Sequence, residues 1–158
     1  MKKFFWLTLF LIMGLGAQEA RAQYTTAIGI RGALSPGVTI KHHLTSDNAL
    51  EGIFVTRWGG IIATGLYEVH FPALGIDNLR WYIGGGGHVG IWSRNNNNPW
   101  FDSEGAVVIG LDGIGGLEYT LPDFPLNFSI DWKPGFNLVG HTGFWSDDGA
   151  LSVRYVFN

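Results

Sequence analysis

Hydrophobic and polar side chains alternate along most of this chain after its first two dozen residues. A period of two is typical of β-strands, and the 3.6-residue period of amphipathic helices is almost absent. Clusters of Gly, Pro, Asn, Asp and Ser separate the alternating segments, as turns do. The pattern predicts eight strands, over residues 24–34, 38–44, 49–58, 61–71, 80–94, 106–120, 126–138 and 150–158.

An even number of antiparallel strands lets the first strand pair with the last, which closes the sheet and leaves no free edge. The predicted fold is therefore an all-β, eight-stranded antiparallel up-and-down barrel. If both termini lie at one end, the connections at 35–37, 59–60, 95–105 and 139–149 lie at the other. The two longest connections are among these, as is usual on the outer side of a membrane barrel.

Side-chain volume decides which face of the strands lines the interior. One face carries bulky apolar residues such as Trp81 and Trp132, and the other is rich in Gly, Ala, Ser and Thr. Eight strands enclose a space just wide enough for side chains. Small residues inside and bulky ones outside fit that space, so we predict a transmembrane barrel. The exceptions, which fall on the face expected to be polar, are Ile53, Val55, Ile62 and Leu66.

Charged residues make up only 15% of the chain, below the quarter typical of soluble domains. Ten of them, five of each sign, fall on the predicted inner face. Because an unpaired buried charge is costly, we expect them to pair and fill the lumen as a salt-bridged plug, with His88 hydrogen-bonded among them. The predicted network comprises Arg31, Lys41, Glu51, Glu68, Arg80, His88, Asp112, Glu118, Asp131, Lys133 and Arg154.

The first residues predict export. Lys2 and Lys3 precede an apolar run at residues 4–16, and small residues stand before a cleavage point at Gln23. This is the pattern of a secretory signal peptide, over residues 1–22, followed by a barrel domain over 23–158. The mature chain would hold 7 basic and 12 acidic residues, and its net charge of −5 argues against nucleic acid as a partner. Without cysteine, neither a disulfide nor a lipoprotein anchor is expected.

Aromatic residues stand near the predicted strand ends on the apolar face, as the interfacial girdles of membrane barrels do. One rim would carry Phe71 and Trp81. The other would carry Trp58 and Phe136, with further aromatics such as Trp145 in its loops.

The signal peptide, the eight alternating segments and the terminal stretch LSVRYVF resemble a small eight-stranded outer-membrane β-barrel protein of Gram-negative bacteria. The plan is similar to that of the outer-membrane protein A barrel domain. The resemblance implies a location in the cell outer membrane, contact with its lipid and lipopolysaccharide, and assembly through periplasmic chaperones and the barrel-assembly machinery. It also implies that Tyr155 and Phe157 form the assembly signal, although Asn158 follows where an aromatic is usually last. We expect a monomer.

Some barrels of this kind are lipid A-modifying enzymes, with His, Ser and an acid near the outer rim. Here His141, Ser146 and Asp147 or Asp148 share the last long loop. Their spacing forces no nucleophile–base geometry. We interpret them as solvated loop residues and assign no catalytic residue.

The remaining histidines do not predict a metal site. His42 and His43 are adjacent, so a regular strand points them to opposite faces. His43 and His70 are expected in the lumen, near the rim that holds the termini. No metal and no cofactor is assigned.

Three functions remain open. The first is a structural or surface-interaction barrel of the cell envelope with a plugged lumen. The second is a lipid A-modifying enzyme, which requires His141 and Ser146 to meet near the outer rim. The third is a soluble periplasmic lipid-binding barrel, which requires the apolar residues to face inward.

Overall fold

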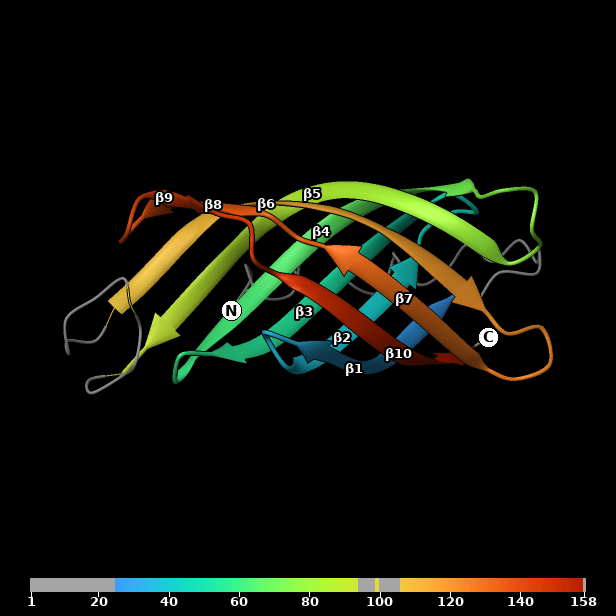
Figure 1. Ribbon diagram of the computed structural model, residues 1–158, viewed down its shortest axis with the longest axis horizontal. Helices are drawn as coiled ribbons and strands as arrows, with labels where there is room; N and C mark the ends of the chain where they lie inside the picture. The colour runs from blue at the N-terminus through green and yellow to red at the C-terminus, as the bar shows by residue number, and fades with distance from the viewer. Residues whose placement is uncertain (1–24, 94–98, 100–105, 158) are drawn as a thin grey trace, which may run out of the picture.

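The computed structural model describes residues 25–93, 99 and 106–157, and the segment predicted to be a signal peptide and Tyr24 fall outside these ranges. The described strands form one antiparallel sheet that closes on itself, because β5 pairs with β6 as well as with β4. Figure 1 shows the strands running obliquely to the long axis, the tilt that barrel closure requires. Among the described residues, no helix is long and apolar enough to cross a membrane.

The strand bounds follow the predicted segments closely. The strands are β1 (Thr26–Ala33), β2 (Gly37–His43), β3 (Asn48–Arg57), β4 (Gly60–Pro72), β5 (Leu79–Trp92), β6 (Ala106–Thr120), β7 (Leu126–Trp132), β8 (Gly135–Val139), β9 (Gly143–Trp145) and β10 (Gly149–Phe157).

The first and last strands close the barrel. β1 pairs antiparallel with β10 from Thr26 opposite Phe157 to Ala33 opposite Ala150. The end of the barrel that holds Thr26, Phe157 and the connections at 44–47, 73–78 and 121–125 is called the terminal rim below. The opposite end, the loop rim, holds the connections at 34–36 and 58–59, the end of β5 and the start of β6, together with the β8–β9 hairpin (Figure 1).

Two of the eight barrel strands are interrupted at the same level. β7 and β8 continue one ladder along β6, where Gly115 lies opposite Trp132 and Asp112 opposite Gly135. Pro134 separates them because it has no N–H for a ladder hydrogen bond. On the other side, β9 and β10 form the eighth strand, and their register against β8 and β7 shifts by one residue at 146–148. This is a β-bulge beside Pro134. The prediction of an uninterrupted segment over 126–138, followed by a loop over 139–149, was wrong at this point.

Apolar side chains cover the outside of the barrel, as the volume argument predicts. Ile30 of β1 lies between Val38 of β2 and Val153 of β10, and the three residues are 67%, 51% and 38% exposed. Similar cross-strand rows continue around the described strands, so the exposed apolar residues form a belt.

The interior is mixed. Ile53, Val55, Ile62 and Leu66 do face inward and form an apolar cluster with other side chains of β3–β6. Trp58, expected in an outer girdle, instead packs partly buried against this cluster. It occupies a two-residue turn in which both Trp58 and Gly59 have positive φ, at 49° and 74°. That geometry matches the twist of a hairpin, and it directs the indole away from the outer surface.

Candidate functional site in the barrel lumen

An ion cluster lies inside the barrel toward the terminal rim, centred on Lys41 of β2. Its Nζ lies 2.8 Å from a Glu68 carboxylate oxygen, 3.3 Å from Glu118 and 3.4 Å from Glu51. All four side chains are at most 2% exposed. Three strands, β3, β4 and β6, thus supply three carboxylates to one ammonium group. β2 and β6 are not neighbours in the sheet, so only barrel closure brings Lys41 to Glu118.

Arg154 of β10 is the second cation of this cluster. Its Nη2 lies 2.5 Å from Glu51 Oε1, and its Nη1 donates to Asn127 at 3.1 Å and to Ser129 at 2.8 Å. The Thr39 hydroxyl also donates to Glu51. Charge-assisted hydrogen bonds of this kind are about twice as strong as neutral ones, so the guanidinium ties β10 to β3 and β7.

A second ion cluster lies nearer the loop rim. Lys133 Nζ bridges Asp112 at 3.2 Å and Asp148 at 3.1 Å. Arg31 Nη1 lies 2.7 Å from Asp131. Lys133 lies beside Pro134, and Asp148 adjoins the bulge. Both continue the inward alternation of their strands, and the Lys133 N–H donates to the Asp148 carbonyl at 2.8 Å, so the ladder is still in register at this buried ion pair.

His88 of β5 belongs to this second cluster. Its Nδ1 lies 2.7 Å from Asp112 Oδ2, and its Nε2 lies 2.9 Å from Asn137 Oδ1. The indole N–H of Trp145 donates to the same Asn137 oxygen at 3.2 Å. Both ring nitrogens of His88 contact protein groups, which favours a structural role in the network over a role as a free ligand.

Tyr82 of β5 links the two clusters. Its hydroxyl donates to Asp131 Oδ2 at 3.1 Å, and Lys41 Nζ lies 3.9 Å from the centre of its ring. A cation above an aromatic face is attracted to the ring quadrupole. The chain of contacts from Arg154 through Glu51, Lys41 and Tyr82 to Asp131 is therefore continuous across the lumen.

Two further ion pairs mark the rims. Arg80 lies 2.9 Å from Asp47 and donates to the carbonyls of Ser46 and His70 at 2.6 and 3.2 Å. Because Asp47 is 63% exposed, this pair is at the solvated terminal rim and apart from the buried clusters that hold the other ten residues of the predicted network. At the loop rim, the Arg57 guanidinium pairs with Asp147.

Glycines make room for the largest inward rings. A Cβ on Gly90 would lie 2.5 Å from the Trp92 ring, and one on Gly135 would lie 2.6 Å from the Trp145 ring. Real Cβ atoms do not approach so closely, so both rings lie against bare backbone. Trp92 is also fixed at its edge, because its N–H donates to the Arg57 carbonyl at 3.0 Å. The abundance of glycine on the inner face thus follows from packing.

The residues of the enzyme hypothesis are arranged for other contacts. Asp148 is 1% exposed and pairs with Lys133, and Asp147 pairs with Arg57. Ser146 accepts a hydrogen bond from the Trp132 indole through its backbone carbonyl, at 2.7 Å. Asp147 and Asp148, the two acids of the enzyme hypothesis, therefore form ion pairs with cations of the lumen and its rim.

Sequence reasoning gave no role to several lumen residues, for two different reasons. The alternation already placed Tyr82, Asn127 and Asn137 on the inner face, so their polar atoms were a usable signal. Asp148 and Trp145 fell in a predicted loop. Asp148 continues the inward alternation of Ala150 and Ser152, which was a usable signal, but no local pattern marks Trp145 as inward.

The proposed assembly signal occupies the outer face of β10 at the terminal rim. Tyr155 and Phe157 are 51% and 48% exposed, and their ring centres are 4.9 Å apart in an edge-to-face arrangement. On the same rim, Phe71 stacks on Trp81 with ring centres 4.5 Å apart.

Comparison with known proteins defines the fold. No protein-family model matches the chain, and no curated protein matches it significantly. Among solved structures, the N-terminal β-barrel domain of OprF from Pseudomonas aeruginosa matches with a TM-score of 0.68. The match covers 87% of this chain and 100% of that domain, at 19% sequence identity. The chain has this eight-stranded barrel fold. The architecture predicted from the alternating segments, including its likeness in plan to the outer-membrane protein A barrel, is therefore confirmed.

Proposed function

We propose that this protein is an integral barrel of the bacterial outer membrane, with a closed lumen and a structural or surface-interaction role in the cell envelope. The observation that carries the proposal is the belt of outward apolar side chains around a charged interior. Burial of apolar surface drives folding in water, yet Ile30, Leu111 and Leu151 are 67%, 57% and 62% exposed. Contiguous exposure on this scale indicates contact with lipid.

The aromatic residues support the same orientation. Two aromatic pairs, Phe71 with Trp81 and Tyr155 with Phe157, lie on the outer face at the terminal rim, on different sides of the barrel. Aromatic rings are enriched at the interface between lipid and water. A soluble lipid-binding barrel would need the reverse arrangement, with the apolar face inside.

The two ion clusters support a closed lumen. Their charged side chains meet across the interior and are joined by Tyr82, so an ion entering from one rim meets paired charges and buried rings. Opening a path would mean separating buried ion pairs. A charge that stays buried without its partner costs about 3–5 kcal/mol. We therefore propose a plug and not a conducting pore.

The proposal includes the partners that such a barrel needs. Outer-membrane lipid would contact the apolar belt, and the lipopolysaccharide of the outer leaflet would contact the barrel at the loop rim. Periplasmic chaperones and the barrel-assembly machinery would act during insertion, through Tyr155 and Phe157 of β10. The charges of the described strands pair within the chain, which supports a monomer.

Fractionation with gel electrophoresis tests the proposal. Closed membrane barrels satisfy their backbone hydrogen bonds within the ring, so we expect outer-membrane location and a mobility in SDS that changes on boiling. Planar-bilayer recording of the purified barrel should detect no steady channel. A protein found in the soluble periplasmic fraction would refute the membrane location, and a stable conductance would refute the plug.

A further inference from the structure

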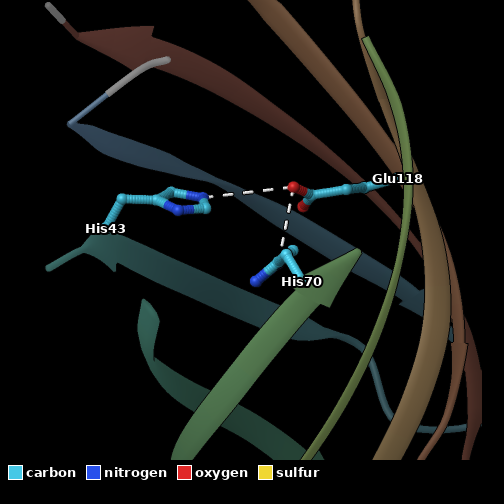
Figure 2. Close-up of side chains that lie close together, drawn as sticks. All are labelled: His43, His70 and Glu118. Carbon is cyan, nitrogen blue, oxygen red and sulfur yellow. Dashed lines mark ion pairs between the residues drawn. The ribbon is translucent and has the colours of Figure 1, made fainter. Parts of the chain in front are cut away.

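Two histidines and a glutamate from three strands meet at the terminal end of the lumen. His43 ends β2, His70 lies in β4 and Glu118 in β6, and all three point toward one another (Figure 2). Glu118 Oε1 lies 3.4 Å from His70 Nε2 and 4.0 Å from His43 Nε2. One ligand atom from each residue lies within 4.8 Å of the others. We infer that this triad binds a divalent transition-metal ion, with Zn²⁺ as the best fit.

The donor set matches the chemistry of zinc. Two imidazoles and one carboxylate, with a fourth position left to water, make a common three-ligand zinc site. Metal–ligand bonds of about 2.0–2.1 Å in a tetrahedron place ligand atoms about 3.3–3.4 Å apart. The separation of His70 and Glu118 already has this value, and His43 has to move by less than the length of a bond to reach it from 4.0 Å.

The side chains are held in position for this role. Glu118 turns Oε2 to Lys41, at 3.3 Å, which leaves Oε1 facing the two imidazoles. Tyr82 stacks on the His70 ring, with ring centres 5.1 Å apart. His70 is 1% exposed, and neither of its ring nitrogens makes a hydrogen bond within the described part of the chain. Buried polar atoms normally have such partners, and a metal ion would supply one.

The charges around the triad also favour a cation. Among the described residues, Glu51, Glu68 and Glu118 contact two permanently charged side chains in this cluster, Lys41 and Arg154, besides the two imidazoles, so carboxylates outnumber permanent cations by one. An excess of buried negative charge is costly, and a bound divalent ion would offset it.

The sequence places His43 and His70 in the lumen near the same rim, but only the adjacent His42 and His43 were considered as a shared metal site, and those two do point apart. The partners of His43 lie on β4 and β6, and barrel closure brings them to it. His43 is 8% exposed at the terminal rim, which gives an ion a way in. The inference rests on this geometry alone and does not depend on the proposed membrane location.

The test uses the whole mature chain without a histidine tag, purified in detergent and stripped with EDTA. Isothermal titration with Zn²⁺ and elemental analysis should find one Zn²⁺ per chain, and Ca²⁺ should not compete because imidazole suits zinc better. His43→Gln and His70→Gln should weaken binding by more than the roughly 10–100-fold loss seen when a second-shell partner is removed. His42→Gln is the matched control. His42 is next to His43 in the chain, but its Nδ1 is hydrogen-bonded to the Thr26 hydroxyl at 2.9 Å. The His42→Gln variant should therefore bind Zn²⁺ as the unaltered chain does.

Absence of Zn²⁺ binding by the unaltered barrel would overturn the inference, as would equal binding by all three variants. Heat-dependent mobility checks that each variant folds. If the His43 and His70 variants do not fold, Co²⁺ added to the unaltered barrel decides the question. A visible absorption spectrum of tetrahedral type that Zn²⁺ abolishes supports the site, and its absence refutes it.

Discussion

Replacement of Lys41 by Met tests whether the lumen clusters stabilise the barrel. Lys41 is the only ammonium group in contact with Glu68 and Glu118 among the described ion pairs. Methionine keeps the length and apolar stem of the side chain, so the change removes the charge with little change in volume.

The expected cost follows from the contacts that remain. In Lys41→Met, Glu51 keeps Arg154 at 2.5 Å, but Glu68 and Glu118 lose a cation that lay 2.8 and 3.3 Å away. Removal of one partner from a buried ion pair costs about 3–5 kcal/mol, because the other charge stays buried without compensation. Two carboxylates are affected here, so we expect a loss toward the upper end of that range, about 4–5 kcal/mol.

The assay is unfolding of the detergent-solubilised barrel in urea, followed by the loss of the heat-modifiable band. Lys41→Met should lower the midpoint strongly. The double variant Lys41→Met with Glu118→Gln should recover part of the loss, since it removes one of the stranded charges.

Asp47→Asn is the control, because it removes the negative charge of the rim pair with Arg80 at a side chain that is 63% exposed, and it leaves Arg80 its hydrogen bonds to the Ser46 and His70 carbonyls. Exposed pairs contribute about 0–1 kcal/mol, so its midpoint should change little. If the Lys41 and Asp47 variants unfolded at the same urea concentration, the argument from buried charge would be wrong.

Three further predictions concern packing, assembly and activity. Gly90→Ala should lower the free energy of unfolding in urea by about 1–3 kcal/mol, the usual cost of overpacking, because the new methyl group meets the Trp92 ring. Gly65→Ala is the control and should be close to neutral, since nothing lies within 4 Å of its added Cβ. Equal effects of the two variants would contradict the close contact at Gly90. Phe157→Ser should delay the appearance of the heat-modifiable form in outer membranes of pulse-labelled cells while leaving the urea midpoint of the assembled protein nearly unchanged; unaltered kinetics would remove Phe157 from the assembly signal. His141→Ala should leave the mass spectrum of lipid A unchanged, because Asp147 and Asp148 are committed to ion pairs, and a changed spectrum would revive the enzyme hypothesis.

The sequence by itself determined the faces of the strands and the way the barrel closes. In a strand, successive side chains point to opposite sides, so the alternation at 150–157 fixed that Tyr155 and Phe157 face outward and Arg154 inward. Turn residues marked the boundaries, and the even number of strands implied pairing of the first with the last. These are local properties, readable from neighbours in the chain.

Only the tertiary structure decided which inward groups meet. The tilt and register of a closed barrel set the partner of each charge across the lumen, and nothing local to Lys41 indicates Glu118, which lies 77 residues away. The bulge at 146–148 turned Trp145 inward from a segment that reads as a loop, whereas Asp148 continues the inward alternation of Ala150 and Ser152. The same closure placed His43 beside His70 and Glu118, because a site assembled from three strands depends on long-range geometry that an alternating pattern does not encode.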